Sequence, residues 1–383
     1  MAHIKKIIIL LLLIFPNLTF SQCLNSNFEL GNFTNWSGRR GTCCPINLPT
    51  NGILNGRQTI MTQGIDPHSC GGLNMVYQGN FSARLGNDAV GARAEGLYYQ
   101  FTVSPNSTLI QYAYAVVLQD PGHNDGDQPR FQSRVRLQNG NVIPCTEYMV
   151  TAGPNLSGYN YCTEIDSQGN LVQVAWSDWR VITLDLSGYI GQVVTLEFET
   201  GDCELGAHYG YAYIDAISCG PIETQVSYCL DSDSILVEGP EGFATYEWVP
   251  TGDTTRVITI GPQDYDTLWC NVTTVTGCEL QLEVLLNPVG VLAEIICDNT
   301  CIGDTVYFTN LTPLINGYNL LFYWDFGDGQ NSIEYSPSHF YELPGAYIVT
   351  LTVEVEGTNC TDITYCEVII YEEPIPINEI EHD

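Results

Sequence analysis

The stretch Tyr323-Trp324-Asp325-Phe326-Gly327-Asp328-Gly329 decides the fold of the C-terminal part of the chain. Side chains alternate between the two faces of a strand, so Trp324 and Phe326 point to the same side and belong to an apolar core. Asp328-Gly329 then supplies a tight hairpin turn. The later segment 347–353 also alternates and places Tyr347 and its odd-numbered neighbours on one face. This pattern predicts a β-sandwich.

The rest of the chain shows the same short alternating segments. Examples are Leu97–Val103, Leu109–Leu118 and Phe131–Leu137, with Asn-Gly, Pro-Gly and Leu-Ser-Gly turns between segments. No stretch after the first 21 residues has a convincing helical period. We therefore predict an all-β protein made of tandem β-sandwiches.

The charge of the chain excludes two classes of partner. The formal net charge is −32, and Arg256 is the only Lys or Arg after Arg180. A surface this acidic repels nucleic acids and anionic membranes. We therefore expect no nucleic-acid partner. The uneven distribution of charge also indicates regions that are built differently.

Residues 1–21 have the pattern of a secretory signal peptide. Lys5-Lys6 precedes the apolar run Ile7–Phe15, and Thr19 and Ser21 flank a cleavage site before Gln22. The run is too short to span a bilayer, so we expect no membrane insertion after cleavage. These features predict a secreted protein, extracellular or on a bacterial cell surface.

Fifteen cysteines in a secreted chain indicate disulfides, and the odd number leaves at least one thiol unpaired or bonded outside the chain. Cys43-Cys44 are adjacent, and Cys297 and Cys301 have no matching pair with zinc-site spacing. The spacing therefore disfavours zinc.

The segment around Trp324 closely resembles the PKD domain. The WDFGDG motif is followed by Ser336-Pro-Ser-His339-Phe-Tyr341 and by the Gly-x-Tyr-x-Val-x-Leu-x-Val pattern at 345–353. The resemblance implies a noncatalytic sandwich that serves as a spacer or contacts proteins and glycans. Two disulfides are expected here because they join early strands to late ones: Cys301–Cys360 and Cys297–Cys366.

The N-terminal region resembles the jelly-roll sandwiches of carbohydrate-binding modules and MAM-like domains. The resemblance rests on Asn25–Trp36, Ser82–Asn87 and Tyr211–Cys219. It implies a structural calcium ion held by Glu29 and Asp215, the only cofactor that we expect. The alternative is that Glu29 is a solvated charge and Asp215 a turn former. Cys23 and Cys219 flank the same ends and are expected to form a disulfide.

A second cation site is a weaker prediction, because Asp120, Asp125 and Asp127 miss the spacing of an EF-hand loop. His123 and His208 are either metal ligands, a base, or hydrogen-bonded loop residues, and we favour loop residues.

A glycan site needs a flat aromatic ring under the sugar and polar groups at its hydroxyls. The candidates for this ligand-binding role are Trp176, Trp179, Tyr209, Arg130 and Arg134. The alternative is that the aromatic residues form the sandwich core and the arginines pair with local carboxylates.

The order Cys229…Trp248…Cys270 resembles a small immunoglobulin-like domain, although Cys278 is an equally good partner for Cys229. We also expect Cys145 to pair with Cys162. The predicted organisation is a signal peptide at 1–21, a jelly roll at 22–220, an Ig-like domain at 221–288, a PKD domain at 291–371 and an acidic linker or tail at 372–383.

Known catalytic signatures such as Gly-x-Ser-x-Gly, His-Glu-x-x-His and the P-loop are absent from the sequence. We therefore predict a noncatalytic adhesion or binding protein, in which the jelly roll recognises extracellular glycans or surface proteins and the other domains are spacers. The architecture is similar to type IX-secreted adhesins and gliding-associated proteins. Two alternatives are the ancillary region of a secreted polysaccharidase or peptidase, and a purely structural surface-layer protein.

Overall fold

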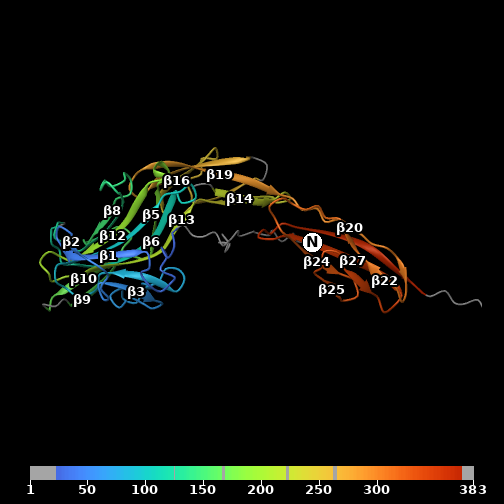
Figure 1. Ribbon diagram of the computed structural model, residues 1–383, viewed down its shortest axis with the longest axis horizontal. Helices are drawn as coiled ribbons and strands as arrows, with labels where there is room; N and C mark the ends of the chain where they lie inside the picture. The colour runs from blue at the N-terminus through green and yellow to red at the C-terminus, as the bar shows by residue number, and fades with distance from the viewer. Residues whose placement is uncertain (1–22, 125, 166–168, 221–223, 262–264, 373–383) are drawn as a thin grey trace, which may run out of the picture.

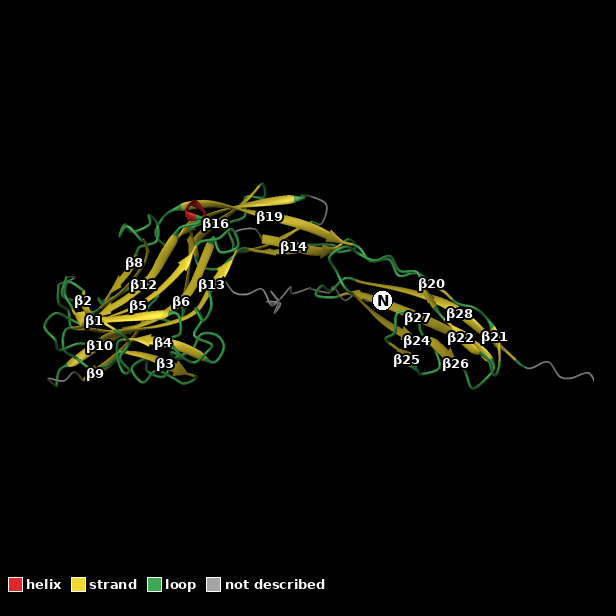
Figure 2. Cartoon of the chain, in the orientation of Figure 1, coloured by secondary structure: helices red, strands yellow, loops and turns green. Residues whose placement is uncertain are grey.

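The computed structural model describes residues 23–124, 126–165, 169–220, 224–261 and 265–372. These residues form β-sandwiches that follow one another along an elongated, arched molecule (Figure 1). Strands dominate throughout, and η1 (Ser187–Tyr189) is a single short 3-10 helix (Figure 2). The predicted all-β fold class is confirmed. Residues 1–21, most of the tail and Asp125 lie outside the described residues.

The first domain contains two facing sheets. The six-stranded sheet has the order β2-β1-β5-β12-β7-β8. Its strands are β1 (Trp36–Thr42), β2 (Asn47–Asn51), β5 (Arg93–Thr102), β7 (Arg130–Leu137), β8 (Tyr148–Thr151) and β12 (Val193–Gly201). The seven-stranded sheet has the order β3-β4-β13-β6-β10-β9, and β11 also pairs with β6. Its strands are β3 (Gln58–Thr62), β4 (Phe81–Leu85), β6 (Leu109–Asp120), β9 (Asn160–Ile165), β10 (Leu171–Trp176), β11 (Arg180–Asp185) and β13 (Gly210–Gly220).

The core of this domain lies between its two sheets and packs aromatic rings among aliphatic side chains. Phe28 stacks on Trp36 at a ring-centroid distance of 4.6 Å, and Phe198 meets Tyr112 edge-on at 5.0 Å. Nε1 of Trp36 donates to the carbonyl of Asn25 at 2.9 Å, so its polar group is satisfied in the core. This packing seats the N-terminal segment against β1.

Two disulfides of the first domain each join segments that lie side by side in the fold. Cys23 is bonded to Cys219, as predicted, because the N-terminal segment lies beside the end of β13. The predicted pair Cys145–Cys162 is wrong, because Cys162 lies on β9 of the seven-stranded sheet and bonds to Cys70. Cys145 instead follows β7 in the other sheet and bonds to Cys278 of the second domain.

The second domain packs a four-stranded sheet, with the order β14-β19-β18-β16, against the pair β15–β17. Trp248 is fully buried, and its Nε1 donates to the carbonyl of Thr255 at 2.8 Å. Cys229 bonds to neither of the partners considered for it, because it lies at the far end of the domain and reaches Cys360. The strands are β14 (Thr224–Cys229), β15 (Ile235–Glu238), β16 (Phe243–Val249), β17 (Val257–Ile260), β18 (Thr267–Thr274) and β19 (Glu279–Val289).

The third domain has a five-stranded sheet of order β21-β28-β27-β24-β25, with the short pairs β20–β23 and β22–β26 packed on it. Trp324 and Phe326 are 0% and 2% exposed and face the core, as the alternation predicts. The strands are β20 (Ile295–Ile296), β21 (Thr300–Cys301), β22 (Thr305–Tyr307), β23 (Thr309–Asn310), β24 (Leu320–Asp325), β25 (Asn331–Ser332), β26 (Ser338–Phe340), β27 (Gly345–Val355) and β28 (Thr361–Tyr371).

The turn after β24 requires a glycine. Gly327 has φ +80°, and a Cβ there would lie 2.6 Å from the carbonyl oxygen of Ile348.

One of the two disulfides predicted for the third domain is present: Cys297 bonds to Cys366. The predicted pair Cys301–Cys360 is wrong, because Cys360 lies at the β27–β28 turn that faces the second domain, whereas Cys301 is exposed and unpaired among the described residues.

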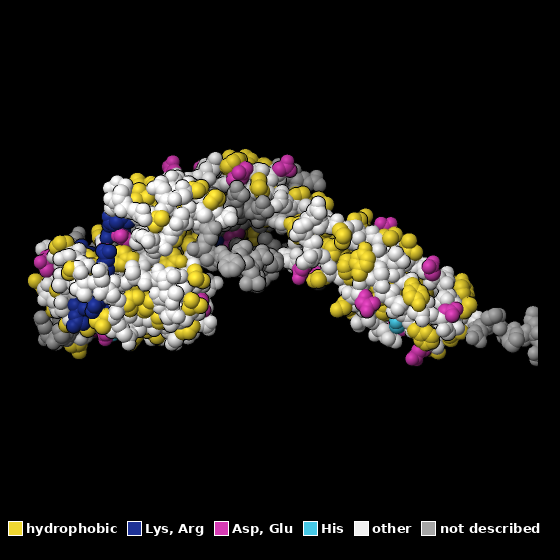
Figure 3. Space-filling model, in the orientation of Figure 1, with side chains coloured by type: hydrophobic (Ala, Val, Ile, Leu, Met, Phe, Trp, Pro, Cys, Tyr) yellow, Lys and Arg dark blue, Asp and Glu magenta, His cyan; other side chains and the backbone are white. Residues whose placement is uncertain are grey.

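Basic side chains are confined to one part of the visible surface. In Figure 3 the blue Lys and Arg side chains lie over the first domain, while Asp and Glu are scattered over all three. Within the described residues, no helix is long and apolar enough to cross a membrane.

Candidate binding cleft between the first and second domains

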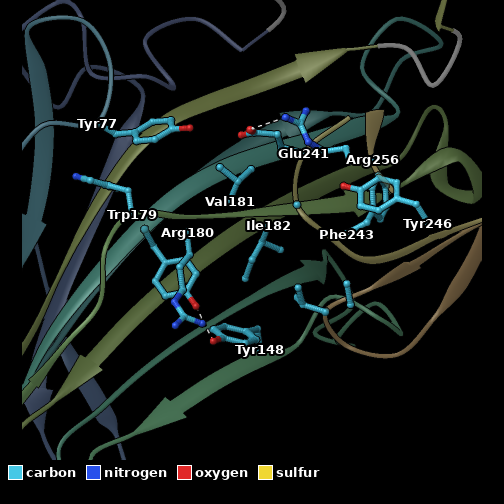
Figure 4. Close-up of a pocket in the computed structure, with 14 residues that line it drawn as sticks. Tyr77, Tyr148, Trp179, Arg180, Val181, Ile182, Glu241, Phe243, Tyr246 and Arg256 are labelled. Atoms are coloured by element: carbon cyan, nitrogen blue, oxygen red, sulfur yellow. Dashed lines mark hydrogen bonds and ion pairs between the residues drawn. The ribbon is translucent and has the colours of Figure 1, made fainter. Parts of the chain in front are cut away.

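A cavity of about 750 Å³ lies where the first domain meets the second (Figure 4). The first domain contributes the loop before β4 and the segment that enters β11. The second domain contributes the β15–β16 loop and neighbouring strands. Its main lining side chains are Tyr77, Tyr114, Tyr148, Trp179, Arg180, Val181, Ile182, Glu241, Phe243, Tyr246 and Arg256.

Side-chain hydrogen bonds to a backbone carbonyl hold the β15–β16 loop against β11 and β6. Thr183 Oγ1 donates to the carbonyl of Glu241 at 2.6 Å, and Gln111 Nε2 donates to the same oxygen at 3.1 Å. Gly242 has φ +91°, and a Cβ there would lie 2.6 Å from Thr183 Oγ1. Only glycine permits so close an approach. This contact brings the Glu241 side chain to the rim of the cleft.

A disulfide reinforces the same interface. Cys145 and Cys278 are bonded, and Thr276 Oγ1 donates to the carbonyl of Cys145 at 2.9 Å. The two domains are therefore joined by the chain itself, by a covalent cross-link and by polar contacts at β11. These restraints fix the two walls of the cleft relative to each other.

One wall is aromatic. The rings of Tyr77 and Trp179 lie 5.6 Å apart at 43°, and Tyr77 is 41% exposed. Nε1 of Trp179 donates to the carbonyl of Asn74 at 2.8 Å, which fixes the indole. The amide of Tyr77 donates to Oδ2 of Asp215 at 2.8 Å. The indole is thus held by its own N–H and the Tyr77 backbone by its amide, while part of both rings stays open to the cleft.

The part of the cleft next to this aromatic wall is charged. Arg256 Nη2 lies 3.5 Å from Oε1 of Glu241, and its Nη1 also pairs with Glu238. Burial, together with the nearby Glu241 carboxylate, raises the pKa of Tyr77 above its usual value. Tyr77 therefore stays a neutral hydroxyl at physiological pH. The cleft offers hydrogen-bond donors and acceptors beside the aromatic wall, as Figure 4 shows.

Of the three predicted aromatic platform residues, only Trp179 lines the cleft. Trp176 is 8% exposed and packs on Gly72, where a Cβ would lie 2.3 Å from the indole. Tyr209 is 5% exposed, and its hydroxyl donates to Glu164 at 2.7 Å. The prediction that Trp176 and Tyr209 are open platforms is wrong, because the loop between β3 and β4 covers their face of the sheet.

The two predicted arginines have protein partners. Arg130 donates to the carbonyls of Gln128 and Gly126 at 3.2 and 2.5 Å. Arg134 lies on the outer face of the six-stranded sheet and pairs with Glu197 at 2.6 Å and Glu199 at 2.8 Å. This matches the alternative interpretation, in which arginines pair with local carboxylates.

Glu29 and Asp215, the predicted calcium ligands, bind the same loop. Glu29 accepts hydrogen bonds from the amides of Asn80 and Phe81 at 3.0 and 3.1 Å. Asp215 accepts from the amides of Tyr77 and Gln78 at 2.8 and 3.0 Å. Both carboxylates thus hold the segment that carries Tyr77 into the cleft. Whether an ion also binds there stays a prediction.

In the weaker predicted cation site, Asp120 and Asp127 have different protein partners. Asp120 Oδ1 accepts from the amide of Gly122 at 2.9 Å and from Gln128 Nε2 at 3.0 Å, so it shapes the β6–β7 loop. Asp127 lies beside Glu204, and the hydrogen bond between them raises the pKa of Glu204. The same loop brings the ring of His123 to 5.4 Å from that of His208.

Sequence reasoning missed Tyr77, Glu241 and Arg256. They come from three separate segments in two domains, and no spacing along the chain links them. Only the isolation of Arg256 in an acidic region offered any signal in the sequence.

Comparison with known proteins gives one family match. Residues 292–368 match the PKD domain, and no curated protein matches the chain. Among solved structures, TmCBM61 in complex with β-1,4-galactotriose is 11% identical, with a TM-score of 0.27, and the match covers 52% of this chain and 96% of that one.

Two further solved structures resemble parts of the chain. The fibronectin(III)-like modules of Clostridium thermocellum CbhA are 9% identical over 42% of this chain and 95% of that one, with a TM-score of 0.24. An amphioxus IgVJ-C2 molecule is 13% identical over 38% of this chain and 100% of that one, with a TM-score of 0.21. The family match is the specific one: residues 292–368 form a PKD domain.

Proposed function

We propose that this protein is an exported, noncatalytic binding protein that recognises a glycan in the cleft between its first two domains. The observation that carries the proposal is the partly exposed Tyr77–Trp179 pair, which lines the same cavity as the Glu241–Arg256 ion pair. The extensive disulfides and the PKD domain are compatible with an extracellular location.

The chemistry of the two walls matches a sugar ring. A pyranose has an apolar C–H face, which packs on a flat aromatic ring, and hydroxyls at its edge, which exchange hydrogen bonds with charged side chains. The Tyr77–Trp179 wall offers the first kind of surface. Arg256 donates and Glu241 accepts beside this wall.

The site also assigns a role to the second domain. Glu241, Tyr246 and Arg256 belong to it, so it contributes to recognition rather than acting only as a spacer. Rigid placement of its loop against β11 reduces the ordering cost of binding. The PKD domain then holds the binding unit away from the cell surface.

The two alternative functions, a passive surface layer and the ancillary region of a secreted enzyme, predict different properties of the cleft. A passive surface layer has no use for a pair of partly exposed aromatic rings beside an ion pair, so the cleft favours recognition. The ancillary region of a secreted polysaccharidase would bind a glycan in the same way. In that case the preferred glycan would also be the substrate of an associated catalytic domain.

The test uses the full chain without residues 1–21, folded with its disulfides, on arrays of neutral and acidic polysaccharides. Trp179→Ala and Tyr77→Ala are each expected to weaken binding about tenfold or more, a loss of roughly 1.4 kcal/mol. Trp269→Ala removes an exposed indole from the second domain outside the cleft and is the matched control. Absence of glycan binding, or an equal loss in Trp269→Ala, would exclude the proposal.

A further inference from the structure

A compact cluster of metal-ligating side chains lies in the loops beyond the C-terminal end of β6. His123 comes from the β6–β7 loop, and Cys203 and His208 come from the β12–β13 loop. One ligand atom from each residue lies within 4.8 Å of the others, and Cys203 Sγ is 3.4 Å from His208 Nδ1. From these residues we infer that the cluster is a binding site for a transition-metal ion of the zinc class.

The distances suit such an ion. Zinc binds thiolate at about 2.3 Å and imidazole at about 2.0–2.1 Å, so tetrahedral ligands lie roughly 3.3–3.7 Å apart. The Cys203–His208 pair already has this spacing. A thiolate and two imidazoles are the ligands that zinc prefers, whereas calcium requires oxygen ligands. Three protein ligands leave a fourth position for water.

Burial and hydrogen bonding also favour a ligand at this place. Cys203 is fully buried and His208 is 7% exposed. Among the described residues, the buried Nδ1 of His123 has no hydrogen-bond partner. A buried ring nitrogen without a partner is unfavourable, and a metal ion at the cluster would satisfy it directly or by drawing in water.

The loops that carry the ligands are held together by several bonds. Cys203 N donates to the carbonyl of His208 at 3.1 Å, and the amide of Glu204 donates to the carbonyl of Asp127 at 3.1 Å. Gln128 Nε2 donates to the carbonyl of His123 at 3.2 Å. These bonds position the ligands before any ion binds.

Cys203 differs from the other two described cysteines without a disulfide in its surroundings. Cys270 lies in the core of the second domain, and burial raises its pKa to about 11. Cys301 is exposed. Of the three described cysteines without a disulfide, Cys203 alone belongs to a cluster with two imidazoles. Cys203 is therefore the one of these three thiols that is placed to bind a metal ion.

The site is separate from the glycan cleft. Gln111 touches the second domain near the start of β6, whereas the cluster follows Asp120 at the other end of that strand. Nine residues of extended chain span about 30 Å. Metal binding and glycan binding can therefore fail independently.

The test titrates the chelator-treated full chain with Co²⁺ and then displaces it with Zn²⁺. We expect one ion per chain, visible d–d bands of a tetrahedral site and a thiolate-to-cobalt charge-transfer band. Cys203→Ser removes the charge-transfer band, and His123→Gln weakens binding at least tenfold. Cys301→Ser is the matched thiol control, and His68→Gln is the matched imidazole control.

Three results would overturn the inference. They are the absence of stoichiometric Co²⁺ and Zn²⁺ binding in the wild type, an unchanged charge-transfer band in Cys203→Ser, and loss of that band in Cys301→Ser. Circular dichroism of each apo variant separates loss of a ligand from loss of the fold. If both Cys203→Ser and His123→Gln fold normally and bind metal like the wild type, the cluster is not a metal site.

Discussion

Cys145 and Cys278 are bonded to each other although 133 residues separate them and they belong to different domains. The disulfide lies at the same interface as the contact between Thr183 and Glu241. The cleft between the domains therefore has walls whose distance is set covalently as well as by packing. A second interdomain disulfide, Cys229–Cys360, joins the second domain to the PKD domain.

Removal of the first cross-link should weaken glycan binding without unfolding either domain. In Cys145→Ser/Cys278→Ser we expect a several-fold loss of affinity, because the variant must order the two walls when it binds. Calorimetry with the preferred glycan and small-angle scattering of the free protein measure both effects. Cys229→Ser/Cys360→Ser is the control, since it frees the PKD domain and leaves the cleft unchanged. Equal losses in the two double variants would contradict the role given to Cys145–Cys278.

Gly242 of the second domain packs directly against Thr183 of the first. Alanine there meets Thr183 and adopts φ +91°, so we expect Gly242→Ala to cost about 2–4 kcal/mol of interdomain stability. Gly252→Ala has a similar φ of +79° but has nothing within 4 Å of its Cβ, so it carries the backbone strain without the clash. Thermal unfolding and limited proteolysis at the domain junction compare the two. If they are equally destabilised, the close approach to Thr183 is unimportant.

The sequence was sufficient to predict features that depend on local strand patterns and on the pairing of strands within one domain. Alternation placed Trp324 in a core, and the adjacency of first and last strands placed Cys23 beside Cys219. It was insufficient for contacts between domains. Cys145–Cys278 depends on how two folded surfaces meet, and no local pattern encodes that meeting.

The aromatic residues show the same limit. Trp176 and Trp179 lie three positions apart, yet one is covered and the other lines the cleft. The difference arises from the loop between β3 and β4, which crosses the seven-stranded sheet and is tethered by Cys70–Cys162. Asp66 in this loop accepts hydrogen bonds from Tyr211 and Tyr213 at 2.8 and 2.7 Å. A strand pattern identifies the face of the sheet but not the loop that covers it.

The calcium prediction for Glu29 and Asp215 is tested by selective chelation. If calcium binds there, a calcium-selective chelator lowers the melting temperature, and added Ca²⁺ restores it. Glu29→Gln should abolish this response, because the neutral amide is a weaker calcium ligand. Glu147→Gln, which changes an exposed carboxylate of the first domain away from both predicted ion sites, is the control. A melting temperature unaffected by calcium-selective chelation would leave the two carboxylates as anchors of the Tyr77 loop alone.

The PKD domain should lose stability in acid through Asp328. Nε2 of His339 lies 2.7 Å from Oδ2 of Asp328, and the amide of Gln330 donates to Oδ1 at 3.0 Å. Burial acts to raise the pKa of Asp328, but the bonds from His339 and Gln330 outweigh it and hold the pKa below its usual value. A carboxyl with a lowered folded pKa stabilises the fold above about pH 4 and loses that contribution as the pH falls through its folded pKa.

Asp328→Asn should therefore destabilise the domain by about 1–3 kcal/mol at neutral pH, the cost of losing a hydrogen bond to a charged group. The difference from the wild type should shrink steadily below about pH 4, where the wild-type carboxyl becomes protonated as well. Hydrogen exchange of peptides spanning β24 to β26 in the full chain measures this across the pH range. Glu342→Gln, an exposed neighbour, is the control. A difference that stays constant in acid would show that Asp328 acts through the geometry of its turn and not through its charge.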